Sequence, residues 1–148
     1  MAAGFTTWTV LKNKPIAKLE PNLWYVSGRM ARGTERKMVV AKRSDGDFVI
    51  FNAIALDPAG MAELEAYANL RYLLVPNGFH RQDAIIWKTR YPQLKVVFKR
   101  WMCVRDRAAW QAQLAQLAEA TTRIIPGHGG IIEAQVGPAL LGARALFG

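Results

Sequence analysis

The sequence has 148 residues, the length of one ordinary domain, and 51% of them are hydrophobic, which excludes a chain too polar to build a core. Its net charge of +9 attracts anions such as a small anionic molecule or, on charge alone, nucleic acid, although a solvated basic surface without a partner explains the charge at least as well. No apolar run approaches the roughly 20 residues of a membrane-spanning helix, and the first residues lack a signal-peptide pattern. The single cysteine, Cys103, excludes an internal disulfide. We therefore expect one cytoplasmic domain, residues 1–148, without a membrane partner and with a homodimer as the default assembly.

The first part of the chain reads as β-strands. Residues 22–27, 38–42 and 48–52 are rich in β-branched and aromatic side chains. The last two of these runs flank the polar stretch 44–47, in which Asp45-Gly46 supplies the positive φ values that a tight turn demands. The pattern predicts an antiparallel hairpin.

After residue 56 the pattern changes to an alternation of helices and short strands. Asp57 can accept hydrogen bonds from free helix amides, and Pro58 suits the first helical position. The predicted elements are a helix from 58 with Met61, Leu64 and Ala68 on one stripe, a strand at 72–75, a helix at 80–90, a strand at 94–98, a helix capped by Asp106, and a strand at 123–125. Antiparallel strands followed by this alternation predict an α/β protein with a mixed sheet.

Both histidines of the chain lie in loops that follow predicted strands. His80 belongs to the loop 75–83, and His128 belongs to the Gly-rich loop 125–130. Loops that leave the carboxyl ends of strands are where sites gather in α/β folds. The two histidines can converge with Asp83 to hold Zn²⁺ or relay a proton, or each can tie down its own loop by hydrogen bonds.

Several segments, in the right order, make the chain resemble the metallo-β-lactamase superfamily. They are the strand 22–26, the Asp45-Gly46 hairpin, the helix entry Ala55-Leu56-Asp57, the segment 75–80 followed by Trp87 and Tyr91-Pro92, and the late loop 125–129. The middle segment is similar to a branch of that superfamily whose members keep the scaffold and alter the metal motif. The resemblance implies a reduced, divergent member with an αββα sandwich.

The main metal motif of the superfamily, His-x-His-x-Asp-His, is mostly lost here. With His80 on its second histidine, Gly78 falls on the first, Gln82 on the aspartate and Asp83 on the last histidine. Residues 95–122 contain no histidine, and the acids there, Asp106 and Glu119, read as a helix cap and a solvated face. The resemblance therefore implies a degenerate metal site with His80, Asp83 and His128 as its largest protein ligand set.

The sequence leads to three functional hypotheses. The first is a protein of this fold that lacks orthodox dinuclear zinc chemistry and binds a small anionic ligand or a partner, with Asn77, His80, Asp83, His128 and Gly129 as candidate ligand-binding residues. The second is a mononuclear metal-dependent hydrolase of an ester, thioester or phosphodiester, in which His80, Asp83 and His128 hold the ion. A zinc ion there would lower the pKa of its bound water to about 7. The third is a nucleic-acid-binding module. No catalytic residue is assigned.

Two groups of residues are candidates for an anion pocket. The amides of residues 127–130 can cradle an anion, although turn geometry alone also explains their glycines. Basic residues gather at Arg29, Arg32, Arg36 and Lys37, and again at Lys99, Arg100, Arg105 and Arg107. Of these, Arg29, Arg32 and Arg36 either line a pocket or face solvent.

Overall fold

A computed structural model describes residues 4–67, 69–78, 80–98 and 106–145, with side chains as far as Ala143. Ala68, Cys103 and the basic residues Lys99, Arg100 and Arg105 lie outside the described residues. The chain divides into two compact units, Met1–Trp101 and Met102–Gly148. The single domain spanning 1–148 stays a prediction, and each unit is described by itself.

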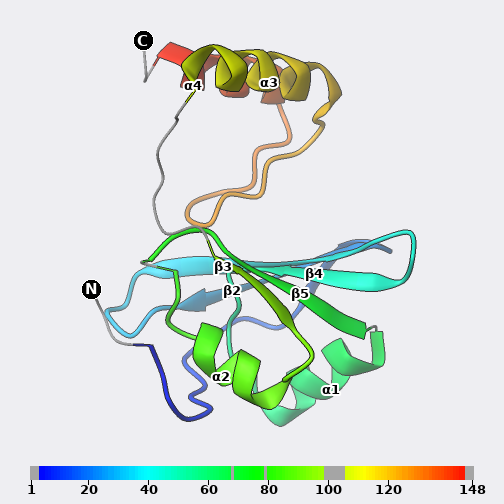
Figure 1. The fold of residues 1–148 in the computed structure, drawn as a ribbon, viewed down its shortest axis with the longest axis vertical. Helices are drawn as coiled ribbons and strands as arrows, with labels where there is room; N and C mark the ends of the chain where they lie inside the picture. Colours follow the sequence, from blue (N-terminus) through cyan, green and yellow to red (C-terminus); the bar gives the residue numbers. More distant parts are fainter. Residues whose placement is uncertain (1–3, 68, 79, 99–105, 146–148) are drawn as a thin grey trace. The chain divides into compact units, whose positions relative to one another are not determined.

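The first unit is built on one six-stranded sheet in the order β1-β2-β3-β4-β5-β6. Neighbours from β1 to β4 pair antiparallel, whereas β4, β5 and β6 pair parallel. This confirms the mixed sheet that the sequence predicted (Figure 1). The strands are β1 (Ala17–Glu20), β2 (Leu23–Arg29), β3 (Glu35–Lys42), β4 (Asp47–Phe51), β5 (Asn69–Val75) and β6 (Lys95–Phe98).

The predicted hairpin joins β3 to β4. Gly46 has a φ of 85°, and the Asp45 side chain accepts a hydrogen bond of 3.1 Å from the Asp47 amide. The edge strand β1 was not predicted, because its residues Ala-Lys-Leu-Glu have higher helix than strand propensity. Pairing with β2 overrides that local preference.

Helices α1 (Pro58–Tyr67) and α2 (Ala84–Arg90) cover one face of the sheet (Figure 1). Asp57 caps α1 as expected, since its Oδ1 accepts a 2.8 Å hydrogen bond from the Gly60 amide. The predicted helix at 80–90 was wrong in its start, because residues 80–83 form turns and α2 begins only at Ala84. The core between helices and sheet includes Trp87, Phe48, Met38, Ile50, Leu64 and Leu73, all fully buried.

The second unit contains helices α3 (Arg107–Ala120) and α4 (Val136–Ala145). Asp106 caps α3 as predicted, accepting a 2.9 Å hydrogen bond from the Ala109 amide. The predicted strand at 123–125 is only an isolated bridge between Ile124 and Ile132. Helix α4 was missed because its sequence contains Gly, Pro and Gly, which are poor helix formers. None of the described helices is long and apolar enough to cross a bilayer.

Candidate site at the carboxyl ends of β4 and β5

Three connections meet at one edge of the sheet in the first unit. Because β4 and β5 are parallel, the loops that follow them, 52–57 and 76–83, leave the same edge. Strand β2 runs in the same direction as β4, so the turn between β2 and β3 lies at this edge too. Gln82 joins two of these connections, since its Oε1 accepts a 3.3 Å hydrogen bond from the Ala31 amide.

His80 is oriented by a buried asparagine. The Nδ1 atom of His80 lies 3.1 Å from Oδ1 of Asn52, and Nδ2 of Asn52 donates a 2.8 Å hydrogen bond to the Lys37 carbonyl. A carbonyl only accepts, so the amide orientation is fixed and Oδ1 must accept from a protonated Nδ1. Neutral His80 in this tautomer is protonated on Nδ1 and carries its lone pair on Nε2.

Asn52 was not singled out from the sequence. It has no exposed surface and a φ of 57°, a left-handed conformation that Asn tolerates better than most residues other than Gly. The backbone amide of Asn52 also donates a 3.0 Å hydrogen bond to the Leu74 carbonyl of β5. Asn52 was the last residue of the predicted strand 48–52, whereas the observed β4 ends at Phe51, and a polar residue at a strand end was the available signal.

Asp83 is held by an ion pair inside the protein. Its carboxylate pairs with the Arg36 guanidinium, and both side chains are only 1% exposed. The other oxygen, Oδ1, accepts a 3.2 Å hydrogen bond from the Ala55 amide, while Arg36 Nη1 donates a 3.3 Å hydrogen bond to the Ala53 carbonyl. Because the side chain turns to these partners, it makes no capping hydrogen bond to α2.

Burial and charge act in opposite directions on Asp83. Burial raises the pKa of the carboxyl group, and the nearby Arg36 guanidinium opposes that rise. The ionised carboxylate therefore depends on its guanidinium partner, and the pair is one electrostatic unit.

Arg36 does not lie where the sequence predicted it. It was expected to line a pocket or face solvent, but it is buried. Arg36 alternates with Met38 and Val40 on β3, and this period of two puts all three on the face that packs against the helices. That periodicity was readable in the sequence, since Met38 and Val40 belonged to a predicted strand.

Asn77 serves the loop that carries His80. The His80 amide lies 3.2 Å from the Asn77 carbonyl oxygen and 3.3 Å from Asn77 Oδ1. Such a turn, with an asparagine side chain accepting from an amide further along, is a common way to fix a loop. Asn77 thus contacts the backbone of a candidate residue, and ligand contact by Asn77 stays a prediction.

The late loop belongs to the second unit. The Ile124–Ile132 bridge closes it with two 3.0 Å hydrogen bonds, His128 is exposed, and Gly129 has a φ of 80°. His80 and Asp83 share one loop of the first unit, whereas His128 and Gly129 lie in the other unit. The complete ligand set therefore stays a prediction.

The residues at the altered motif do not fit an orthodox dinuclear zinc centre. Gly78 has no side chain, Gln82 Oε1 accepts from an amide, and both oxygens of Asp83 are engaged. Zinc requires several nitrogen, sulfur or carboxylate lone pairs arranged around it. Within the described ranges, no three His, Cys, Asp or Glu side chains are grouped so as to hold a metal ion.

Comparison with known proteins identifies the fold. No protein-family model and no curated protein matches the sequence. The structure is similar to the FIM-1 metallo-β-lactamase of Pseudomonas aeruginosa in its mono-zinc form, with 8% identity, a TM-score of 0.55, and coverage of 90% of this chain and 96% of that chain. A metallo-β-lactamase from Hirschia baltica is 10% identical, with a TM-score of 0.53 and coverage of 88% and 98%. The DIM-1 metallo-β-lactamase exposed to ceftazidime is also 10% identical, with a TM-score of 0.56 and coverage of 95% and 100%.

The chain therefore has a metallo-β-lactamase-like fold, as its sequence predicted. With identities of 8–10%, what these proteins share with it is the fold. The described residues contain one six-stranded sheet, in keeping with a reduced version of the sandwich.

Proposed function

We propose that this protein is a binding module on a metallo-β-lactamase-like fold. In this module a buried ion pair, and not a metal ion, holds the loop after β5 in place. In this proposal it does not carry out orthodox dinuclear zinc hydrolysis, and its ligand is anionic. The observation that supports it is the buried Arg36–Asp83 pair.

The ion pair argues against a metal ion at Asp83, because Arg36 and the metal ion would compete for the same carboxylate. A metal at Asp83 would have to displace the Arg36 guanidinium and leave that charge buried without its partner. Breaking a buried pair in this way costs about 3–5 kcal/mol. Arg36 instead supplies a permanent positive charge that ties β3 to the loop after β5, a task that needs no metal.

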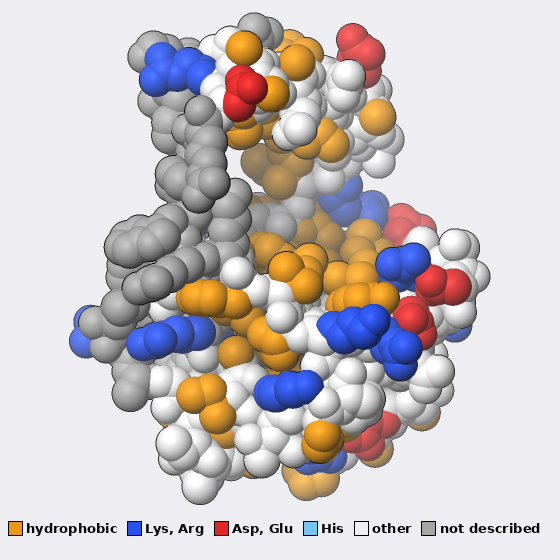
Figure 2. Space-filling model, in the orientation of Figure 1, with side chains coloured by type: hydrophobic (Ala, Val, Ile, Leu, Met, Phe, Trp, Pro, Cys, Tyr) orange, Lys and Arg blue, Asp and Glu red, His pale blue; other side chains and the backbone are white. Residues whose placement is uncertain are grey.

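The preference for an anionic ligand follows from the charge. The chain carries 20 Lys and Arg against 11 Asp and Glu. On the face drawn in Figure 2, the Lys and Arg side chains of the first unit, in blue, form separate groups rather than one continuous stripe. Separate groups suit a small anion better than a long polyanion, which engages cations along its length.

The test is the zinc content of the purified protein, measured by mass spectrometry together with its melting temperature before and after a strong chelator. We expect zinc well below one ion per chain and an unchanged melting temperature. Two tightly bound zinc ions per chain would overturn the proposal. One zinc ion that is lost on chelation and absent from His80→Ala would favour the mononuclear hydrolase instead.

A further inference from the structure

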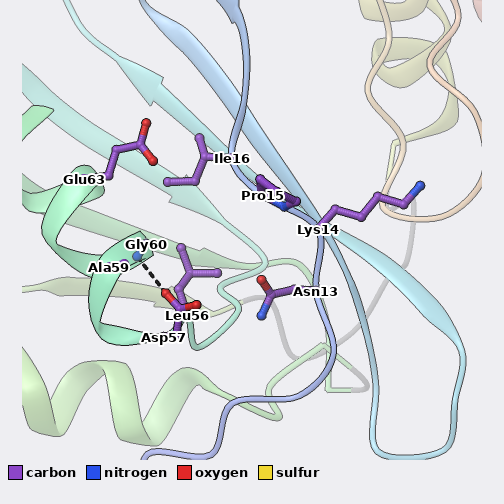
Figure 3. A pocket seen from close by; sticks show the side chains of 9 residues that line it. All are labelled: Asn13, Lys14, Pro15, Ile16, Leu56, Asp57, Ala59, Gly60 and Glu63. Carbon is purple, nitrogen blue, oxygen red and sulfur yellow. Dashed lines mark hydrogen bonds between the residues drawn. The ribbon is translucent and has the colours of Figure 1, made fainter.

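Two clefts flank the segment that precedes β1, and they share Asn13 and Lys14. The first, of about 310 Å³, contains Asp57 and Glu63 and is drawn in Figure 3. Its acids already have partners, because Asp57 caps α1 and Glu63 forms an ion pair of 2.6 Å with Lys18. The Lys14 side chain extends away from both acids in Figure 3.

The second cleft, here called the basic cleft, has a volume of about 360 Å³. The residues that line it are Lys12, Asn13, Lys14, Ser27, Gly28, Arg29 and Glu35. Three cations thus face one carboxylate. Arg29 and Glu35 lie at the end of β2 and the start of β3, the same sheet edge as the Arg36–Asp83 pair.

Strand register places the side chains of Lys12, Lys14 and Arg29 on one face. Asn13 pairs antiparallel with Gly28, which sets Lys12 opposite Arg29 and Lys14 opposite Ser27. Residues opposite each other, and residues two apart on one strand, point to the same side. Two cations directly opposite each other repel, and a bound anion between them relieves that repulsion.

The three cations are not committed to ion pairs within the described part of the chain. Ion pairs in that part of the chain use other cations, among them Lys18, Arg36, Arg43, Arg71, Arg90 and Arg123. A ligand would therefore not have to break an existing pair of Lys12, Lys14 or Arg29, and the site keeps its charge for an incoming anion.

The floor of the basic cleft is fixed before any ligand arrives. The Lys14 amide donates a 2.8 Å hydrogen bond to the Ser27 carbonyl, and the Arg29 amide donates a 3.0 Å hydrogen bond to the Lys12 carbonyl. Gly28 permits this approach, because a Cβ there would meet Asn13 Cβ at 3.2 Å and Ile54 Cδ1 at 3.1 Å. Ser27 is only 8% exposed and supplies a hydroxyl beside the cations.

We propose that the basic cleft binds the phosphate group of a small molecule, such as a phosphomonoester or a diphosphate. Arg29 presents a planar fork suited to two phosphate oxygens, while Lys12 and Lys14 add mobile point charges. The volume falls in the range of small-molecule sites. This inference rests on the proposed anion-binding function and names its ligand class and its place.

The experiment measures the affinity of the full chain for inorganic phosphate and pyrophosphate by calorimetry at physiological ionic strength. The test variant is Lys12→Gln/Arg29→Gln. The control, Arg71→Gln/Lys95→Gln, removes the same charge from positions outside both clefts. We expect pyrophosphate to bind more tightly than phosphate, and its Kd to rise about tenfold in the test variant and less than about twofold in the control.

A variant that removes a negative charge, and should therefore strengthen anion binding, adds a second test. Glu35→Gln removes the carboxylate of the basic cleft, so the Kd for pyrophosphate should fall about threefold. Absence of pyrophosphate binding by wild type, or equal weakening in the test and control variants, would overturn the inference. A single-stranded oligonucleotide that bound more tightly than pyrophosphate through Lys12 and Arg29 would overturn it too. Zinc content is measured separately, so failure here is distinguishable from failure of the metal-free proposal.

Discussion

The two histidine loops look alike in sequence and differ in structure. The loop after β5 is tied into the sheet, with Asp83 paired to Arg36 and His80 facing the buried Asn52. The loop 125–130 of the second unit is closed by the bridge between Ile124 and Ile132, and its histidine is exposed. A histidine after a strand thus reveals little by itself, because the contacts of its loop depend on residues far away in the sequence, such as Asn52 and Arg36.

The largest loss of stability is expected at the contact between β3 and the loop after β5. Arg36→Met removes the guanidinium and leaves a buried carboxylate without its ion-pair partner, so the free energy of unfolding should fall by about 3–5 kcal/mol. Urea unfolding of the variant beside wild type measures this. Arg32→Met, an exposed position of the neighbouring turn, is the control and should change stability by less than about 0.5 kcal/mol.

The loss of unfolding free energy caused by Arg36→Met should also depend on pH. Without the guanidinium, burial is opposed only by the hydrogen bonds from Ala55 and Gln82, so the pKa of Asp83 in the folded state rises further above the ordinary value of about 3.9. A raised carboxyl pKa leaves stability intact below the unfolded-state pKa and lowers it as pH increases. The deficit relative to wild type should therefore shrink as pH falls from 7 toward 4, by at most about 1.4 kcal/mol per pH unit. A deficit constant over that range would show that Asp83 is not the group left unpaired.

An intermediate effect is expected at Asn52. Asn52→Ala removes the acceptor of His80 Nδ1 and the donor to the Lys37 carbonyl, and it forces alanine into a left-handed conformation. Stability should fall by about 1–3 kcal/mol. In nuclear magnetic resonance spectra, His80 should then lose its preference for the Nδ1-protonated tautomer. An unchanged tautomer would contradict the proposed orientation of His80.

The smallest losses of stability are expected for alanine variants of the two histidines, and these variants allow a direct comparison of the two loops. His80→Ala should lower the free energy of unfolding by about 1 kcal/mol, because a hydrogen bond to buried Asn52 is lost. His128→Ala should stay within about 0.5 kcal/mol of wild type, because the side chain is exposed. Thermal unfolding of both variants in parallel decides the ranking, and a larger loss for His128→Ala would reverse the comparison.

Local signals predicted the fold well where turn and cap chemistry was strong. The Asp45-Gly46 turn and the caps Asp57 and Asp106 lie where the sequence placed them. Strand β1 and helix α4 were missed because their own residues favour other structures and neighbours decide the outcome. The site was harder to predict, since the Arg36–Asp83 contact joins residues 47 positions apart. Which distant residues come into contact depends on the order of the strands in the sheet, and that order cannot be inferred from a single sequence.

The most direct test of the central claim is the coupling free energy between Arg36 and Asp83, measured by urea unfolding of wild type, Arg36→Met, Asp83→Leu and the double variant. If the pair is an internal unit that needs no metal, each single variant is strongly destabilised. The double variant should then recover most of the loss, with a coupling of at least about 2 kcal/mol. Additive losses in the double variant, or stability restored to Arg36→Met by added zinc, would contradict the account.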